Sequence, residues 1–214
     1  MTDIAAARRA DCKSSNDLPR WTYMLSVPVF RGARVLEYPP RTRPMECSHV
    51  LPRLYVGSCP ENLEDIARLR REYRVTAVLT FQTDADRRLY NISWDLLREC
   101  YRQWDIAVRQ VPIQDKSEDD LTRKLPESVE ALGQLLDQGH TVFAHCNIGN
   151  GRSPTVVAAW LYWTQGRDLE AAAAEVRQCR ECQPNLNVIR SARLKKPSRA
   201  SGPRPENPRT VAGA

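Results

Sequence analysis

Residues 141–163 (TVFAHCNIGNGRSPTVVAAWLYW) constrain the fold more than any other part of the chain. An apolar segment of strand type, residues 141–145, leads into a loop with two glycines, and an apolar helix is predicted from Arg152 onward. A strand and a helix this apolar must both be buried, so the helix has to pack against a sheet. The chain is therefore predicted to adopt an α/β fold.

Strand-type and helix-type segments alternate along the rest of the chain, which supports the same fold class. A long amphipathic helix is expected to stop just before Gly139, and another to start with Ser93 as its cap. The hydrophobic spacing predicts strands at residues 54–56, 75–81, 107–112 and 141–145, and helices at 62–73, 93–104, 121–138, 152–164 and 169–179.

Length and composition indicate one domain with two extensions. The 214 residues are 42% hydrophobic, which is enough for one well-buried domain and short for two. The longest apolar run, residues 156–163, is far shorter than the roughly 20 residues that span a membrane. We expect a partly disordered N-terminal extension at 1–44 that could pack on the domain, the domain itself at 45–193, and a disordered basic tail at 194–214.

The formal net charge of +6 would suit a nucleic-acid-binding protein, but the distribution of charge argues against that class. Residues 190–214 contain seven basic residues and one acidic residue, so the other 189 residues balance at 25 of each sign. The tail is expected to be solvated, with binding of an acidic partner as the alternative. We expect neither nucleic acid nor a membrane as a partner, and the oligomeric state stays open.

Seven irregularly spaced cysteines, without an apolar leader ahead of them, favour a reducing compartment, and we expect the cytoplasm. An organelle transit peptide is the alternative, although Asp3 and Asp11 interrupt it. Cys179 and Cys182 form a C-x-x-C pair without a second pair, so zinc is not expected.

Cys146, at the end of the predicted strand, is the candidate nucleophile. An arginine six residues later is uninformative by itself, because 27 of the 32 basic residues are arginine and Cys47–Arg53 has the same spacing. The informative features are the flanking histidine, the glycines in the loop and the apolar helix that follows. A loop that enters a helix N-terminus turns backbone N–H groups inward and forms an anion site. The alternative is an ordinary buried cysteine before a helix.

This context gives each neighbouring residue an expected role. Arg152 can hold two phosphate oxygens bidentately, and the positive field of the loop favours the thiolate of Cys146. The Ser153 hydroxyl can hydrogen-bond the sulfur and help it leave, while His145 is expected to orient the loop without touching substrate. Backbone amides that bind phosphate are expected from Asn147, Ile148, Gly149, Asn150 and Gly151, with the two glycines permitting the loop conformation.

A general acid is needed to protonate the leaving oxygen, and residues 111–121 (VPIQDKSEDDL) offer four acidic candidates. Asp119 and Asp120 lie at the start of a predicted helix, where acidic residues are ordinary partners of the helix dipole. Asp115 follows the strand directly and is the preferred acid over Glu118. The alternative is that all four side chains are simply solvated.

The run 145–153 (HCNIGNGRS) resembles the dual-specificity branch of the cysteine-dependent phosphatases. The laforin-like and plant glucan phosphatases of that branch are also similar at LYVGSCP (54–60), VTAV (75–78), FQT (81–83), GHTV (139–142), CQPNL (182–186) and Ile189-Arg190. The resemblance covers about residues 46–193. It implies a central, mostly parallel sheet flanked by helices, no metal and no other cofactor. In that family the general acid precedes a Leu-Pro pair, and Asp115 before Leu125-Pro126 fits.

The resemblance implies hydrolysis of phosphomonoesters through a phosphocysteine, with a phosphorylated glucan of starch or glycogen type as substrate. A phosphoprotein carrying phosphotyrosine or phosphoserine/threonine is the alternative substrate, and a non-catalytic phosphate-binding adaptor is the third possibility. Ile148 and Asn150 depart from the small and apolar residues usual in the glucan phosphatases, and residues 1–44 are too few for a carbohydrate-binding module of normal size.

Two further hypotheses concern residues around this motif. Aromatic side chains could replace the missing carbohydrate-binding module, although burial in the core is the simpler interpretation for most of them. Cys59 could form a reversible disulfide with Cys146 and protect it from over-oxidation. The aromatic candidates are Trp94, Trp104, Trp160, Trp163 and Tyr162.

Overall fold

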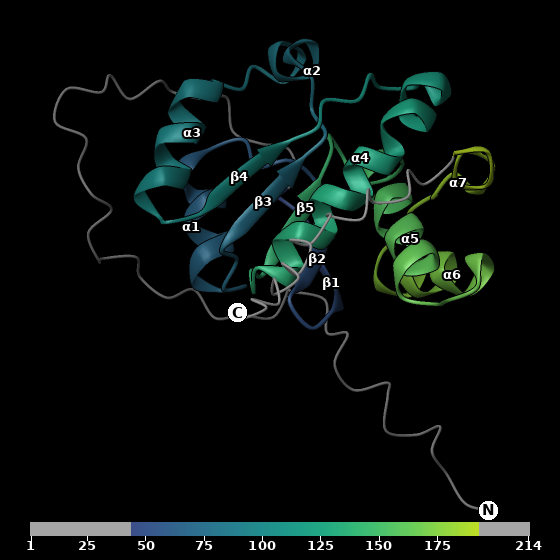
Figure 1. Ribbon diagram of the computed structural model, residues 1–214. Coiled ribbons are helices and arrows are strands. Elements are labelled where there is room, and N and C mark those ends of the chain that lie inside the picture. The colour runs from purple at the N-terminus through teal and green to yellow at the C-terminus, as the bar shows by residue number, and fades with distance from the viewer. Residues whose placement is uncertain (1–43, 193–214) are drawn as a thin grey trace, which may run out of the picture.

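The computed structural model describes residues 44–192, and five strands form one sheet at its centre (Figure 1). The order across the sheet is β1-β2-β5-β3-β4. β1 pairs antiparallel with β2, and every other neighbouring pair is parallel, so the predicted α/β fold with a mostly parallel sheet is confirmed. The strands are β1 (Cys47–Leu51), β2 (Leu54–Gly57), β3 (Ala77–Thr80), β4 (Ala107–Gln110) and β5 (Val142–His145).

Helices cover both faces of the sheet, because the central strands are apolar on both sides. α4, α5 and α6 pack over the main hydrophobic cluster on one face of the sheet, and α1 and α3 pack over a second cluster on the other face. α2 lies at one edge of the sheet (Figure 1). The helices are α1 (Leu63–Arg71), α2 (Asp84–Leu89), α3 (Trp94–Gln103), α4 (Glu118–Asp137), α5 (Arg152–Thr164), α6 (Leu169–Cys179) and α7 (Leu186–Ser191).

The predicted bounds of α5 and α6 agree with the structure, and the predicted start of α4 needs correction. α4 begins three residues before the predicted Leu121, because the Ser117 hydroxyl accepts a hydrogen bond from the Asp120 amide at 3.2 Å and caps the helix. Ser93 is the N-cap residue of α3, as predicted, although its side chain makes no capping hydrogen bond. β1, α2 and α7 were not predicted.

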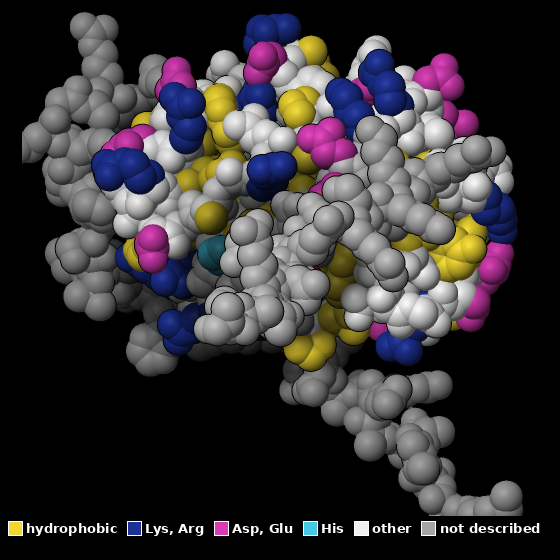
Figure 2. Space-filling view, in the orientation of Figure 1, with side chains coloured by type: hydrophobic (Ala, Val, Ile, Leu, Met, Phe, Trp, Pro, Cys, Tyr) yellow, Lys and Arg dark blue, Asp and Glu magenta, His cyan; other side chains and the backbone are white. Residues whose placement is uncertain are grey.

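The N-terminal extension and the basic tail predicted from the sequence fall almost wholly outside the described residues. Within residues 44–192, no helix combines the length and apolar character needed to cross a membrane. On the face seen in Figure 2, basic and acidic side chains alternate over the described surface without a large area of one sign.

The parallel arrangement brings four connections to one edge of the sheet. β2, β3, β4 and β5 run in the same direction, so the segments that follow their carboxyl ends meet at that edge. Those segments begin at Ser58, Phe81, Val111 and Cys146, and α2 lies above the same edge (Figure 1). The candidate nucleophile and the candidate acid therefore lie at the same edge, although the chain separates them by about thirty residues.

Candidate active site

Cys146 follows β5 directly and is 3% exposed. The Ser153 hydroxyl, in the first turn of α5, donates a hydrogen bond to Cys146 Sγ at 3.4 Å. A hydroxyl donor next to sulfur stabilises negative charge on it, both in the thiolate and in a departing thiolate. The structure thus brings together the two side chains that the sequence assigned to nucleophile and sulfur partner.

The phosphate loop, defined here as residues 146–152, has several carbonyl groups held from outside. The Asn147 carbonyl accepts from the Cys59 amide at 2.8 Å, and the Asn150 carbonyl accepts from the Gln183 amide at 2.8 Å. Peptide groups in the described residues are all trans, so the N–H of each following residue points the opposite way from the held carbonyl. These bonds therefore turn backbone donors toward the inside of the loop, as an anion site requires.

His145 has a supporting contact with the same loop. Its Nδ1 lies 3.1 Å from the Cys146 carbonyl oxygen, which can only accept, so Nδ1 carries the proton. Nε2 is buried and has no hydrogen-bond partner among the described residues. Burial lowers the pKa of His145 to about 4, with the positive charges of Arg152 and Arg87 adding to that effect, so the ring is neutral near pH 7. This geometry fits the predicted orienting role.

The two loop glycines differ in what the fold demands of them. Gly149 has a φ of +70°, and a Cβ there would lie 2.4 Å from the Gly57 carbonyl oxygen, so only glycine fits without rearrangement. Gly151 has an ordinary φ of −110° and open space where a Cβ would stand, so the expectation of a special backbone conformation was wrong for Gly151. Ile148 is 57% exposed, so its side chain does not fill the inside of the loop, where backbone groups remain.

Arg152 is almost fully buried beneath the loop, and its guanidinium is already held by protein groups. Nη1 donates to Asp86 Oδ2 at 2.9 Å and to the Ile113 carbonyl at 2.7 Å. Nη2 lies 3.1 Å from Asp115 Oδ1, whose side chain is 49% exposed. Nε is buried without a hydrogen-bond partner in the described part of the chain. Nη2 also donates to Asp86 Oδ1 at 3.4 Å, so Nε is the guanidinium donor that keeps capacity for a phosphate oxygen.

Asp86 was missed by the sequence analysis. It lies in the first turn of α2, where its carboxylate accepts from the Thr83 amide at 2.8 Å and from Asn147 Nδ2 at 2.7 Å besides its contact with Arg152. Burial would raise the pKa of Asp86, but the bonds from Arg152, Thr83 and Asn147 outweigh burial and hold it at about 2. The signal available in the sequence was the capping pair Thr83-x-x-Asp86 directly after a buried strand.

The acidic candidates separate clearly by their contacts. Asp115 is the candidate that reaches Arg152, whereas Glu118 and Asp119 are exposed in the first turn of α4. Asp120 is buried, and its Oδ2 accepts from the Gln114 amide at 2.7 Å, which anchors the loop carrying Asp115. Burial would raise the pKa of Asp120, but that amide and neighbouring basic side chains hold it at about 2. Asp120 is thus a charged anchor of the acid loop.

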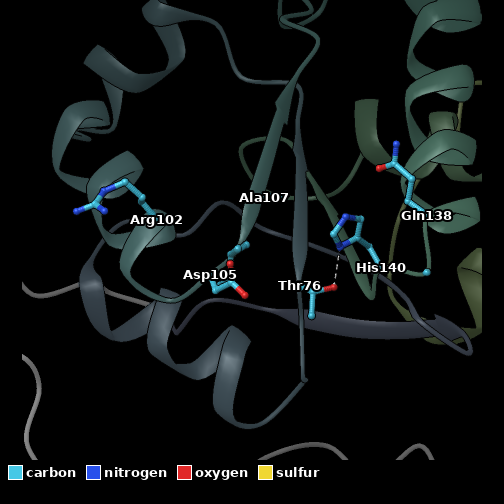
Figure 3. A pocket seen from close by; sticks show the side chains of 8 residues that line it. Thr76, Arg102, Asp105, Ala107, Gln138 and His140 are labelled. Atoms are coloured by element: carbon cyan, nitrogen blue, oxygen red, sulfur yellow. Dashed lines mark hydrogen bonds between the residues drawn. The ribbon is translucent and has the colours of Figure 1, made fainter.

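A surface hollow of about 510 Å³ lies at the opposite edge of the sheet (Figure 3). Thr76 precedes β3, Ala107 begins β4 and His140 precedes β5, so the hollow lies at the amino ends of the parallel strands. A hydrogen bond of 3.1 Å joins the Thr76 hydroxyl and His140 Nδ1 in this hollow (Figure 3). This hollow is therefore separate from the phosphate loop. No set of three or more potential metal ligands is gathered within residues 44–192.

Comparison with known proteins decides the family. Residues 54–196 match the family model described as dual specificity phosphatase, catalytic domain. The chain belongs to the dual-specificity phosphatase family. Laforin of Mus musculus is 36% identical to this dual-specificity phosphatase domain over 135 residues, which are 58% of this chain and 41% of laforin. Phosphoglucan phosphatase LSF1, chloroplastic, of Arabidopsis thaliana is 33% identical over 145 residues, which are 68% of this chain and 24% of the relative.

The chain thus spans less than half the length of either relative. Among solved structures, Tk-PTP in its active form superposes with a TM-score of 0.56 at 24% identity, covering 67% of this chain and 90% of Tk-PTP. That likeness concerns the dual-specificity phosphatase fold alone. The resemblance stated from the motif around Cys146 is confirmed at the level of family and fold.

Proposed function

We propose that the protein is a cysteine-dependent phosphatase that hydrolyses phosphomonoesters through a phosphocysteine intermediate. The observation that carries this proposal is the convergence of four side chains from two connections, β5–α5 and β4–α4. Ser153 lies 3.4 Å from the sulfur of Cys146, and Asp115 lies 3.1 Å from Arg152 at the base of the same loop. A nucleophile, a sulfur partner, an anion-binding guanidinium and an acid are the groups that this chemistry requires.

In the first step, the Cys146 thiolate attacks phosphorus and forms the S–P bond while the bond from phosphorus to the leaving oxygen breaks. Asp115 donates its proton to that oxygen, so the alcohol leaves neutral. Arg152 and the inward-facing amides of the loop bind the equatorial phosphoryl oxygens, where negative charge gathers in the transition state. The buried position of Arg152 fixes its orientation before substrate arrives.

In the second step, a water molecule attacks the phosphorus of the phosphocysteine and the S–P bond breaks. Asp115, now a carboxylate, accepts the proton of that water. The Ser153 hydroxyl donates its hydrogen bond to the departing sulfur, at the distance of 3.4 Å that it already has. The products are inorganic phosphate and the regenerated Cys146 thiolate, and the step needs no metal ligand or cofactor.

We propose a phosphorylated glucan as the substrate class. The support is the identity of 33–36% with laforin and with a relative named phosphoglucan phosphatase, which extends over most of the described domain. A phosphoprotein is the alternative, since the family model is that of dual-specificity phosphatases in general. The exposed Ile148 side chain lies on the loop itself, where it would meet whichever group carries the phosphate.

The aromatic side chains offer limited support for a glucan surface. Trp160 is 9% exposed and Trp163 packs against the main core, so neither presents a free ring. Trp94 and Trp104 are partly buried against the second cluster, with arginine guanidinium groups 4.6 Å and 4.7 Å from their ring centres. Tyr162, at 40% exposed, is the candidate that remains open to a ligand.

A binding test separates the enzyme from the adaptor. Cys146→Ser removes the nucleophile and should abolish turnover while phosphate binding persists, because the loop amides and Arg152 are untouched. Turnover retained at even a tenth of the normal rate would overturn the role of Cys146. Wild-type protein that binds phosphate but releases none from any substrate would favour the adaptor.

Phosphate release from phosphorylated amylopectin, compared with release from a panel of phosphotyrosine and phosphothreonine peptides, decides between the substrate classes. Cys146→Ser serves as the blank. Preferential release from the polymer supports the glucan proposal, and release from peptides alone overturns it in favour of a protein phosphatase. A pulldown on insoluble starch adds an independent readout of glucan binding.

For the compartment we propose the cytoplasm, because the seven cysteines of the chain are irregularly spaced. An organelle is the alternative, since the name of the LSF1 relative places that protein in the chloroplast. Localisation of the full chain with a C-terminal tag would decide between the two compartments.

A further inference from the structure

Arg180 directly follows α6, and its side chain is only 6% exposed. Its Nη2 donates to the Ile148 carbonyl oxygen at 3.1 Å and to Glu46 Oε2 at 2.8 Å. Its Nη1 donates to the Val56 carbonyl at 3.4 Å and to the Ser48 hydroxyl at 3.5 Å. One guanidinium therefore joins the phosphate loop to β1, to β2 and to the segment before β1.

Burial of the Arg180 guanidinium costs free energy. Nε of Arg180 is buried and finds no hydrogen-bond partner among the described residues, and two of the other contacts are long. Burying a guanidinium with incomplete hydrogen bonding destabilises the folded state. A shorter apolar side chain could fill the same space without that cost, so the charge and the donors themselves call for an explanation.

The contact between Arg180 and the phosphate loop supplies this explanation. Backbone donors already hold the carbonyls of Asn147 and Asn150, and Arg180 holds the Ile148 carbonyl, which directly follows that of Asn147. Because the peptide group is trans, an outward Ile148 carbonyl directs the Gly149 N–H toward the inside of the loop. Arg180 also packs against Gly149, since a Cβ built there would lie 3.0 Å from its Nη2.

We propose that Arg180 is a positioning residue that aims the Gly149 amide at the phosphoryl group. This inference rests on the proposed function in that it concerns the same anion site, but it requires only that the loop binds a tetrahedral oxyanion. Arg180 acts from outside the loop and does not touch substrate. Without Arg180, the peptide group between residues 148 and 149 can rotate, because glycine at position 149 permits many backbone conformations.

The test compares Arg180→Gln, Arg180→Lys and the control Arg177→Gln. Arg177 is exposed one turn earlier in α6, so its variant removes the same charge without touching the loop. Each full-length protein is assayed for tungstate binding by calorimetry, for kcat and KM with p-nitrophenyl phosphate, and for thermal unfolding. We expect Arg180→Gln to weaken tungstate binding and lower kcat by roughly 10- to 100-fold while remaining folded. Arg180→Lys should recover part of both losses through one remaining donor.

A folded Arg180→Gln protein with wild-type tungstate affinity would overturn the proposal. So would losses equal to those of Arg177→Gln, or losses that only follow the unfolded fraction. If wild-type protein binds tungstate but turns over no substrate, the proposed phosphatase activity fails, while the tungstate affinities of the variants still decide the role of Arg180.

Discussion

The carboxylate of Asp86 lies 2.9 Å from Nη1 of Arg152, and both side chains are about 95% buried. They are 66 residues apart in the sequence, and the pair forms because α2 lies over the same sheet edge as the start of α5. A buried ion pair fixes the plane of a guanidinium, so Arg152 is oriented before any substrate enters.

Replacing Asp86 by Asn should misalign Arg152 and leave a buried positive charge with one partner fewer. We expect kcat/KM for an aryl phosphate to fall roughly 10- to 100-fold. The matched control is Asp84→Asn, which removes an exposed carboxylate from the same helix and should leave kcat/KM unchanged. Equal kinetics for the two variants would show that Asp86 does not orient Arg152.

Replacing Asp115 by Asn removes the proposed acid but keeps a group of similar shape near Arg152. The loss should depend on the leaving group, because an alkyl alkoxide needs a proton far more than an aryl oxide does. We expect turnover of alkyl phosphates to fall by about 100-fold or more, and that of an aryl phosphate by much less. Equal losses on both substrates would assign the acid to another residue.

Ser153→Ala should slow departure of the sulfur more than attack by it. The phosphocysteine then accumulates, and rapid-quench kinetics should detect a burst of alcohol release followed by a slow steady rate. Intact mass of the quenched protein should reveal one added phosphoryl group. A variant with a lower rate but no burst and no adduct would place the function of Ser153 in the first step.

His145 should contribute to acid sensitivity. Its pKa in the folded protein is about 4, while the unfolded chain takes up a proton near the ordinary value of 6.5. Between those values the unfolded state binds more protons, so the free energy of unfolding falls as pH drops from about 6.5 to 4, by up to about 3 kcal/mol. Urea unfolding of His145→Asn at pH 7 and pH 5 should show a smaller difference than wild type. An unchanged difference would contradict this assignment.

Cys59 and Cys146 should form a disulfide under mild peroxide. The Cys59 amide bonds to the Asn147 carbonyl at 2.8 Å, so Cys59 lies beside the loop. Peroxide oxidises the Cys146 thiolate to a sulfenic acid, and the Cys59 thiol would then displace water to form the S–S bond. Intact mass should show loss of two hydrogens that dithiothreitol restores. Recovery of Cys146 only as sulfinic acid would contradict the predicted disulfide.

The sequence was informative where local pattern and burial agree. The apolar run before Cys146 and the apolar helix after it specified β5 and α5, because nothing else can hold two such segments. β1 was missed since its side chains are mostly half-exposed and show no clear alternation. α2 was missed because its six residues, DADRRL, contain a single large apolar residue at the exposed end.

The site was predictable as far as it is local in sequence. Cys146, Arg152 and Ser153 are set by one loop and one helix turn, and Asp115 by its place directly after a strand. Asp86 is 66 residues from Arg152 in the sequence, and Arg180 is 32 residues from Ile148. Both contacts form only because of the packing of α2 and α6. The capping pair of Thr83 and Asp86 marks a helix start but does not indicate a contact with Arg152, and no local pattern distinguishes Arg180 from the other arginines of the chain.

β5 is the central strand of the sheet and also the last of the five described strands in the order of synthesis. Until residues 142–145 leave the ribosome, β2 and β3 each have one unpaired edge, which is a hazard for aggregation. The residue that emerges next is Cys146. The nascent chain therefore gains its proposed nucleophile only after the strand that joins β2 to β3 has been made, and a chain terminated before residue 142 has neither that strand nor that thiol.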